Sequence, residues 1–213
     1  MRSIFTLVIL ITAITFGNAQ DSKAKKILDE ASTKTKSYKT IKANFQVTLE
    51  NKEAGVSETS KGVLLLKGDK YKVEIMGTIV YFDGKVQYTY IPDSEEVNIS
   101  EPDDENDDFT NPAKIFTIYE KGFNYKFIEN RLYGGIKVSI IDLFPTDNEK
   151  KFDRVRLYIN QKDKMIYEIN SFLKDGGNSI ITVKSLEKNV NAKDSDFTFN
   201  TKAFPDVEVI DMR

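Results

Sequence analysis

The densest group of residues that could do chemistry is the acidic run 101–108, which reads Glu-Pro-Asp-Asp-Glu-Asn-Asp-Asp. Closely spaced carboxylates are ligands that calcium prefers. An EF-hand loop, however, needs a glycine at its sixth position and a glutamate at its twelfth, and this run supplies neither in register. The pattern therefore favours a solvated loop, and we expect no metal there.

The residue types that the chain lacks narrow its chemistry further. It contains no histidine and no cysteine. A Ser-His-Asp triad, a Cys-His pair and an imidazole-bound zinc are therefore impossible. Enzymatic chemistry would have to come from paired carboxylates, lysine or tyrosine, and no recognisable motif gathers such groups. We therefore expect no catalytic residue and no cofactor.

Apolar and aromatic side chains instead dominate the pattern, and their chemistry is binding. Alternation of apolar and polar residues with a period of two indicates strands with one apolar face. Such a face can be plain core, or it can hold an acyl chain, to whose burial each methylene contributes roughly 0.8 kcal/mol. Both interpretations stay open for every single residue. The candidate lining residues form same-face sets on four predicted strands: Phe45, Val47, Leu49, Leu64, Leu66, Tyr71, Val73, Ile75, Tyr88 and Tyr90.

A short apolar segment interrupts this rhythm directly after the acidic run. Pro112 suits the first turn of a helix, and the pattern predicts a short helix from Ala113 to Tyr119. Such a helix would lie as a lid over the open side of the sheet. The predicted lid residues are Pro112, Ile115, Phe116 and Tyr119, of which Ile115 and Phe116 would also line the apolar surface.

The elements that must position these residues are mostly strands. Residues 22–38 follow helical spacing, with Ser22 as a plausible N-cap. Beyond them, turn signals such as Asp83-Gly84 separate the strands, with no helix between most of them. We therefore predict a mainly β (α+β) fold. It would be an antiparallel meander of about 10–11 strands that closes, or partly closes, into a barrel, with an N-terminal helix and a short lid helix over its open side.

The N-terminus has the layout of a secretory signal peptide. Arg2 precedes an apolar run over residues 4–16, and Gly17-Asn18-Ala19 offers small residues for cleavage after Ala19. An uncleaved N-terminal anchor is the alternative. We expect residues 20–213 to form one domain, and we expect a monomer. The net charge of −2 argues against a simple nucleic-acid binder, which would carry a basic patch.

Six segments of the chain occur in the order and spacing of one known family. They are Ala43–Gln46, Gly62–Lys67, Asp83-Gly84-Lys85 to Pro92 with Tyr88 and Tyr90 between, Asn111–Ala113, Asp196–Phe199 and Pro205–Val209. Together they resemble the periplasmic outer-membrane lipoprotein carrier family, LolA. The resemblance covers nearly the whole mature chain, and the segment from Asp83 to Pro92 is its most specific part.

The resemblance implies an incomplete antiparallel β-barrel, a half-barrel, with the lid helix on its concave side. It also implies that this half-barrel takes acylated lipoproteins from an inner-membrane ABC transporter and passes them, across the periplasm, to an outer-membrane acceptor. It implies no cofactor. Two positions depart from the family pattern. Tyr88 stands where the family often has tryptophan, and Lys67-Gly68-Asp69 stands where it commonly has Lys-Arg-Pro. The arginine of that motif helps to latch the lid in the family, so Lys67 or Lys70 is the candidate substitute.

The sequence thus predicts a periplasmic carrier that binds the acyl chains of lipoproteins, and not an enzyme. Two alternatives remain on the same fold. One is a specialised carrier of a free lipid or another amphiphile. The other is a non-catalytic sensor that binds a lipoprotein or a protein partner.

Overall fold

The computed structural model of this protein describes residues 21–51, 53–101, 112–115 and 117–213. The predicted signal peptide, most of the acidic run and Phe116 lie outside these residues. The described chain holds one α-helix, α1 (Ser22–Lys36), and twelve strands. The strands are β1 (Ile41–Asn51), β2 (Val56–Lys67), β3 (Lys70–Ile75), β4 (Thr78–Phe82), β5 (Gln87–Ile91), β6 (Glu96–Ser100), β7 (Phe123–Tyr133), β8 (Ile136–Pro145), β9 (Phe152–Asn160), β10 (Ile166–Leu173), β11 (Gly177–Lys188) and β12 (Glu208–Asp211).

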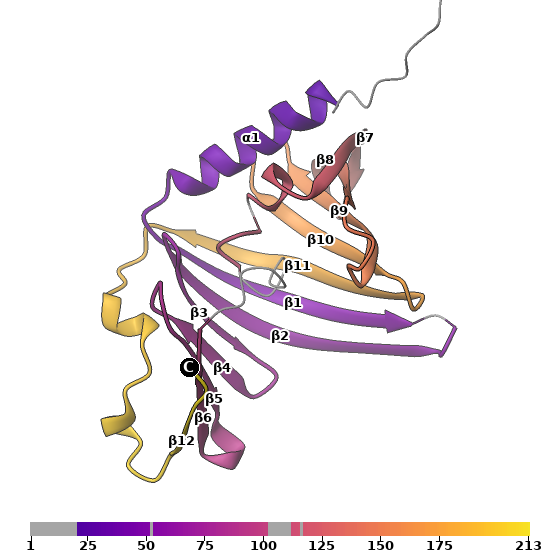
Figure 1. The fold of residues 1–213 in the computed structure, drawn as a ribbon. Coiled ribbons are helices and arrows are strands. Elements are labelled where there is room, and N and C mark those ends of the chain that lie inside the picture. The colour runs from indigo at the N-terminus through magenta and orange to yellow at the C-terminus, as the bar shows by residue number, and fades with distance from the viewer. Residues whose placement is uncertain (1–20, 52, 102–111, 116) are drawn as a thin grey trace, which may run out of the picture.

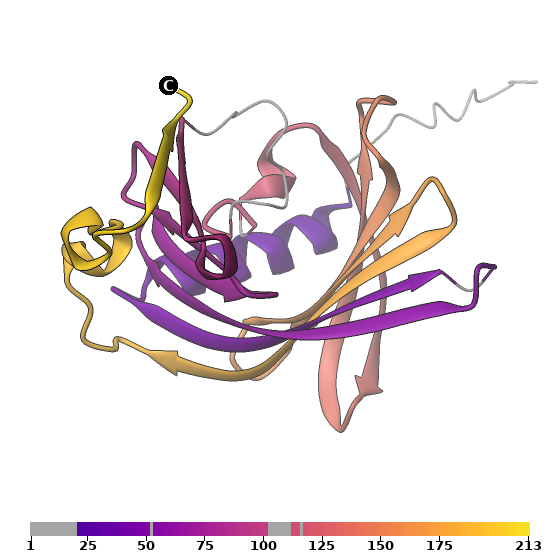
Figure 2. The ribbon, with the colours of Figure 1, turned by 90° about the horizontal axis from the view of Figure 1, so that it is seen from below.

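All twelve strands belong to one sheet, in the order β12-β6-β5-β4-β3-β2-β1-β11-β10-β9-β8-β7. Neighbours are antiparallel except β12, which lies parallel to β6. The pairing of β1 with β11 joins the N-terminal meander to the C-terminal one. Figure 1 shows α1 lying across this sheet, and Figure 2 shows the sheet curving around it. The predicted mainly β half-barrel is confirmed, with twelve strands in place of about 10–11.

The N-cap of helix α1 lies one residue before the predicted cap. Asp21, and not Ser22, is the N-cap, and its Oδ1 accepts the amides of Lys23 and Ala24 at 2.9 and 3.1 Å. Its second oxygen accepts the amide of Phe127 on β7 at 2.8 Å. One side chain therefore caps the helix and fixes it to the last strand of the sheet. Desolvation raises the pKa of Asp21, but the three amide donors together lower it below its usual value.

The predicted lid helix takes a tighter form than an α-helix. Residues 112–115 are turns, and a 3-10 helix, η2, follows at Ile118–Glu120. The amide of Thr117 donates to the Lys114 carbonyl, and that of Glu120 donates to the Thr117 carbonyl, both at 2.9 Å. These i→i+3 bonds fit a segment too short to offset the cost of nucleating an α-helix.

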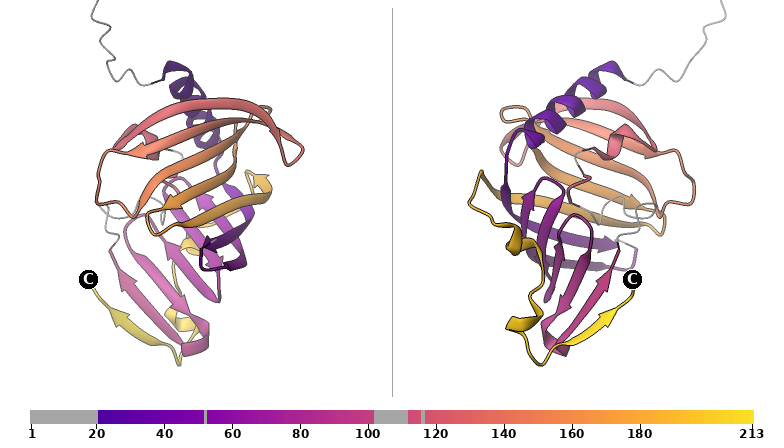
Figure 3. Two further views of the ribbon diagram at one scale, coloured as in Figure 1. Left: turned by 90° about the vertical axis from the view of Figure 1, so that its right-hand side faces the viewer. Right: turned by 60° about the vertical axis from the view of Figure 1, so that its left-hand side comes forward.

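The C-terminal segment covers the opposite, convex face of the sheet. After β11 it passes through two 3-10 helices, η3 (Asp194–Phe197) and η4 (Thr201–Ala203), before β12. Phe199 packs against Tyr90 of β5 at a centroid distance of 4.9 Å, and Phe204 lies 5.0 Å from the same ring. Figure 3 shows this segment running alongside β3 to β6. Phe197 ends the first of these 3-10 helices, and Phe199 lies in the irregular chain that follows it.

Candidate functional site

A cavity of about 230 Å³ lies on the concave face, where β1, β2 and β3 meet β10 and β11. Sixteen residues line it, and every one of them is apolar. No ionisable side chain is among them, so the cavity offers contact with hydrocarbon and no partner for a charge. The lining residues are Ile41, Ala43, Phe45, Val47, Leu64, Leu66, Val73, Ile75, Pro112, Ile115, Met165, Ile166, Ile169, Ile181, Val183 and Leu186.

The alternation of each strand explains why these side chains converge. On β1 the odd-numbered residues from Ile41 to Val47 face the cavity. Five of their register partners line it with them, namely Leu66 and Leu64 on β2 and Leu186, Val183 and Ile181 on β11. The register of β1 with β11 shifts between Asn44 and Phe45, so that Ala43 pairs with Leu186 and Phe45 with Val183. This β-bulge keeps Val183 and Leu186 on one face although three positions separate them.

The lid covers the cavity from above and is anchored to α1. Pro112 and Ile115 contact the cavity, whereas Tyr119 is buried in the core beneath α1. The Tyr119 hydroxyl donates to Oδ1 of Asp29 at 3.0 Å, and Lys25 Nζ bonds the other oxygen at 2.7 Å. Burial and the hydrogen bond to Asp29 raise the pKa of Tyr119. The hydrogen bond from Lys25 lowers the pKa of Asp29. The anchored end of the lid is therefore its C-terminal end.

A second hollow, of about 400 Å³, borders other residues of the same lid. It is lined by Ala113, Lys114 and Thr117, by the C-terminal end of α1 and by the turn at Gly68-Asp69. It shares Ile41 and Leu66 with the apolar cavity. The lid segment thus separates two hollows that have part of their floor in common.

Sequence comparison decides the family. A family model described as outer membrane lipoprotein carrier protein LolA matches residues 14–140, which is more than half of the chain. The chain belongs to this family. No curated protein matches the sequence.

Solved structures share the LolA-type fold at low sequence identity. An uncharacterized conserved protein from Thermus thermophilus has a TM-score of 0.58 and 12% identity, over 89% of this chain and 99% of its own. The lipoprotein LppX from Mycobacterium tuberculosis has a TM-score of 0.51 and 12% identity, over 81% and 98% of the two chains. At such identities the likeness concerns the fold.

Among the described contacts, the lysines that could replace the LolA family's latch arginine bind the C-terminal segment. Lys67 Nζ lies 2.7 Å from Oδ1 of Asp194, and Lys70 Nζ lies 3.0 Å from its other oxygen. These two lysines lower the pKa of Asp194 to about 2. The described links between the lid and α1 are the hydrogen bond from Tyr119 to Asp29 and the ion pair of Lys36 Nζ with Glu120 Oε1 at 3.8 Å.

Eight of the predicted site residues border the cavity of this LolA-family chain, and the other described ones do not line it. Leu49 is 39% exposed at the outer end of β1. Tyr71 is only 1% exposed and donates its hydroxyl to Gln87 Oε1 at 2.9 Å, within the core below the cavity. Phe116 lies outside the described residues. The eight that border it are Phe45, Val47, Leu64, Leu66, Val73, Ile75, Pro112 and Ile115.

Tyr88 and Tyr90 point away from the cavity. In the sheet register Val73 pairs with Val80, and Val80 pairs with Thr89, so Thr89 shares the concave face. Its neighbours Tyr88 and Tyr90 therefore face the convex side, where they pack with Phe199 and Val207. The sequence showed that Tyr88 and Tyr90 share one face of their strand, but it did not show which face of the sheet that is.

Half of the lining comes from residues that sequence reasoning missed. Met165 precedes β10, and the others lie on β1, β10 and β11. Their strands were predicted, but the pairing of β1 with β11, more than a hundred residues apart, brings them to the cavity. The missed residues are Ile41, Ala43, Met165, Ile166, Ile169, Ile181, Val183 and Leu186.

The described residues contain no group of three or more acidic, histidine or cysteine side chains placed to hold a metal ion. None of their helices is both long and apolar enough to cross a membrane.

Proposed function

We propose that this protein is a periplasmic carrier that binds the acyl chains of lipoproteins in its half-barrel and delivers them from the inner to the outer membrane. The observation that carries the proposal is the cavity on the concave face, whose sixteen lining residues are all apolar. A surface of this kind stabilises hydrocarbon through burial alone, by roughly 0.8 kcal/mol for each methylene. Membership of the LolA carrier family supports the same conclusion.

We expect the lid to move when cargo binds, because Pro112 and Ile115 of the lid line the cavity. The neighbouring hollow adds about 400 Å³ if the lid segment between them shifts. In this movement Pro112 to Ile115 would be displaced, while the hydrogen bond from Tyr119 to Asp29 would be kept.

The carrier role assigns partners and location to the protein. The cargo would be loaded by an inner-membrane lipoprotein-releasing ABC transporter and passed to an outer-membrane acceptor. The protein would work as an exported monomer, with the N-terminal segment removed after Ala19. It would act without a cofactor and without catalysis.

One observation favours a second candidate, a specialised carrier of a free lipid or another amphiphile. The apolar cavity is small, about 230 Å³, which suits one hydrocarbon chain better than several. The two candidates differ in what remains attached to the chain, a polypeptide or a small head group.

Two experiments test the carrier role. Gentle purification from the periplasm followed by native mass spectrometry should recover the protein together with acyl-modified polypeptide, whereas a free lipid would identify the specialised carrier. Depletion of the protein in cells should leave lipoproteins in the inner membrane. Normal arrival of lipoproteins at the outer membrane in depleted cells would refute general lipoprotein transport by this chain.

A further inference from the structure

Strand β2 is longer than its neighbour β3, and part of its edge is open. Over its whole length, from Val56 to Lys67, β2 pairs with β1. On its other side β3 pairs only with residues 62–67 of β2. Within the described chain, residues 56–61 therefore have no strand beside them on that side. An open edge presents amide and carbonyl groups that a further strand can pair with.

The hairpin that joins β2 to β3 shows which residues present these groups. Its two-residue turn, Gly68-Asp69, lies between the paired residues Lys67 and Lys70. In such a hairpin the flanking pair exchanges both backbone hydrogen bonds, and every second residue of the strand points the same way. Ser57, Thr59 and Lys61 therefore direct their amides and carbonyls to the open side.

Two of the features that usually protect an edge, proline and a β-bulge, are absent from this stretch. Residues 56–61 contain no proline, and their register with β1 is continuous, without a bulge. Their side chains are mostly exposed, and only Glu58 and Lys61 carry charges, of opposite sign. The edge is therefore regular and available to a strand of moderate length.

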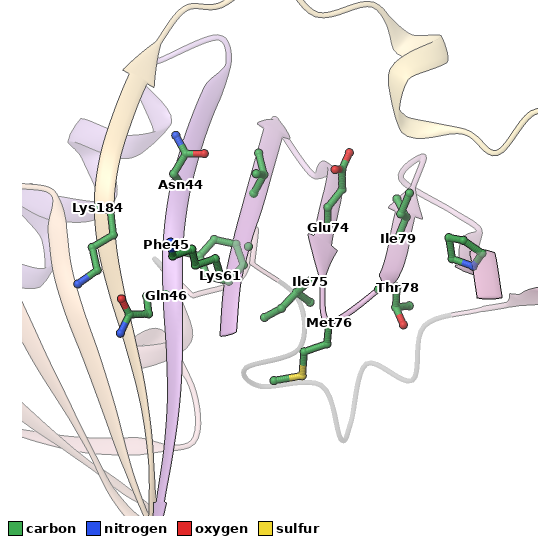
Figure 4. A pocket seen from close by; sticks show the side chains of 14 residues that line it. Asn44, Phe45, Gln46, Lys61, Glu74, Ile75, Met76, Thr78, Ile79 and Lys184 are labelled. Atoms are coloured by element: carbon green, nitrogen blue, oxygen red, sulfur yellow. The ribbon is translucent and has the colours of Figure 1, made fainter. Parts of the chain in front are cut away.

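A groove of about 670 Å³ adjoins this edge where the hairpin of β3 and β4 ends (Figure 4). Lys61 and Gly62 of β2 line it on one side, and Met76, 58% exposed, lies at the end of the hairpin. The groove shares Phe45 and Ile75 with the apolar cavity. The groove's other lining residues Asn44, Gln46 and Glu74 alternate with these two along their strands and face the convex side. The groove and the cavity therefore lie on opposite faces of the sheet and share only Phe45 and Ile75, where the hairpin of β3 and β4 ends.

Gly62 lies directly under the ring of Phe45. A Cβ at this position would lie 2.4 Å from Cζ of Phe45 and 2.9 Å from the carbonyl oxygen of Glu74. The Phe45 ring thus covers the site where β2 loses its neighbour. Any side chain here would displace that ring from the boundary between groove and cavity.

The charges of the groove favour an acidic occupant. It is lined by Lys61, Lys184 and Glu74, but Glu74 is paired with Lys72 at 2.7 Å. Two lysines therefore supply the net positive charge of the groove. An extended peptide that carries aspartate or glutamate complements both this charge and the backbone groups of the edge.

We propose that the open edge of β2 binds, by strand addition, the extended acidic peptide that follows the acylated residue of the cargo. The proposal rests on the proposed function, because it is the acyl chain in the cavity that brings this peptide to this edge. Strand addition relies on main-chain hydrogen bonds. It would therefore let one carrier hold cargo proteins of many different sequences.

The test compares two probes that carry the same chain. One is an N-palmitoylated peptide rich in glutamate and serine, and the other is palmitoyl ethanolamide. Calorimetry should show that the wild-type protein binds the acyl-peptide about tenfold more tightly, the gain expected from one or two net hydrogen bonds. Equal affinities for the two probes would overturn the proposal and leave the carrier role intact. Failure of both probes to bind would overturn both.

A matched pair of variants locates the effect at the edge. Thr59→Pro removes an amide that points to the open side, where no ladder bond is lost. Thr59→Val keeps the amide, and both variants lose the contact of 3.1 Å with the Thr48 hydroxyl. Thr59→Pro should abolish the tenfold gain and leave the affinity for the ethanolamide unchanged, whereas Thr59→Val should keep the gain. A gain that survives in Thr59→Pro would place the peptide elsewhere.

A further variant covers the case in which the proline disturbs folding. Lys61→Glu should weaken binding of the acidic acyl-peptide, strengthen that of a lysine-rich acyl-peptide and leave the ethanolamide unaffected. Amide hydrogen exchange of wild-type protein should show protection of Ser57, Thr59 and Lys61 with the acyl-peptide only. Unchanged exchange at these three amides would overturn the proposal.

Discussion

The two halves of the concave face have the same apolar alternation but different contents. Over β7–β9, the filled half, α1 contributes Ala24, Leu28 and Ala31 to a core of buried side chains. Over β1–β3 and β11, the open half, only Pro112 and Ile115 of the described chain reach the cavity from above. The difference shows that the covering segment, and not the strand pattern, decides whether an apolar face becomes core or cavity.

Truncation of one leucine in each half should give the largest contrast. Leu157→Ala removes a side chain that is 1% exposed in the filled half and should lower the free energy of unfolding by about 2–5 kcal/mol. Leu64→Ala, in the open half, should cost about 1 kcal/mol, because its side chain already borders empty space. Urea unfolding of both variants measures the contrast. Equal losses would mean that the open half is as tightly packed as the filled half.

Enlarging one alanine in each half should destabilise the protein only when the alanine lies in the filled half. Ala31→Leu overfills the core beneath α1 and should cost about 1–3 kcal/mol. Ala43→Leu extends into the cavity and should leave stability nearly unchanged. Since it occupies space for the cargo, it should weaken acyl-chain binding by about tenfold, the equivalent of two methylenes. Thermal unfolding and a palmitate titration measure the two effects. Unchanged palmitate affinity in Ala43→Leu would place the chain outside the cavity.

Loosening the lid at its anchor should have a smaller effect. Tyr119→Phe deletes the hydroxyl that donates to Asp29 and should cost about 1 kcal/mol, with faster exchange of the lid amides. Asp29→Asn keeps an acceptor and is the milder control. If hydrogen exchange of residues 113–120 is the same in Tyr119→Phe and wild type, this hydrogen bond does not hold the lid.

The same anchor should be insensitive to pH over a wide range. The pKa of Tyr119 is raised, so its contribution is complete below the usual tyrosine value of about 10 and is lost at higher pH. The pKa of Asp29 is lowered, so its contribution is complete above the usual value of about 4 and is lost in more acidic solution. Exchange of the lid amides, corrected for intrinsic rates, should therefore be flat from about pH 5 to 9. A transition near pH 7 would contradict this assignment.

The smallest effect is expected at the C-terminal segment. Asp194→Asn breaks exposed ion pairs with Lys67 and Lys70, and its consequences should vanish at high salt. The lowered pKa of Asp194, about 2, means that the contribution of the wild-type pairs is lost as the pH falls from about 4 to 2. Melting temperatures at two salt concentrations measure it. A loss that persists at high salt would indicate a role beyond charge.

Much of the open half could be predicted from the sequence, because alternation is a local property. Phe45 and Val47, or Val73 and Ile75, lie two residues apart on one strand, and they share a face whatever the rest of the chain does. The N-terminal helix followed in the same way from its spacing.

The rest depended on long-range pairing and on covering segments. Ile181 reaches the cavity because Val47 pairs with it across more than a hundred residues. Tyr90 alternates like Val73, yet it faces the convex side, because Phe199 and Phe204 cover it there. Either face of a strand can be the buried one until the segments that cover the two faces are known.

A structure of the protein with an N-palmitoylated peptide tests the central claim most directly. The account predicts that the acyl chain lies in the open half, in contact with Phe45, Leu66 and Ile181, with Pro112 to Ile115 displaced and the filled half unchanged. An acyl chain bound on the convex face, or one that displaces α1 from the filled half, would contradict it.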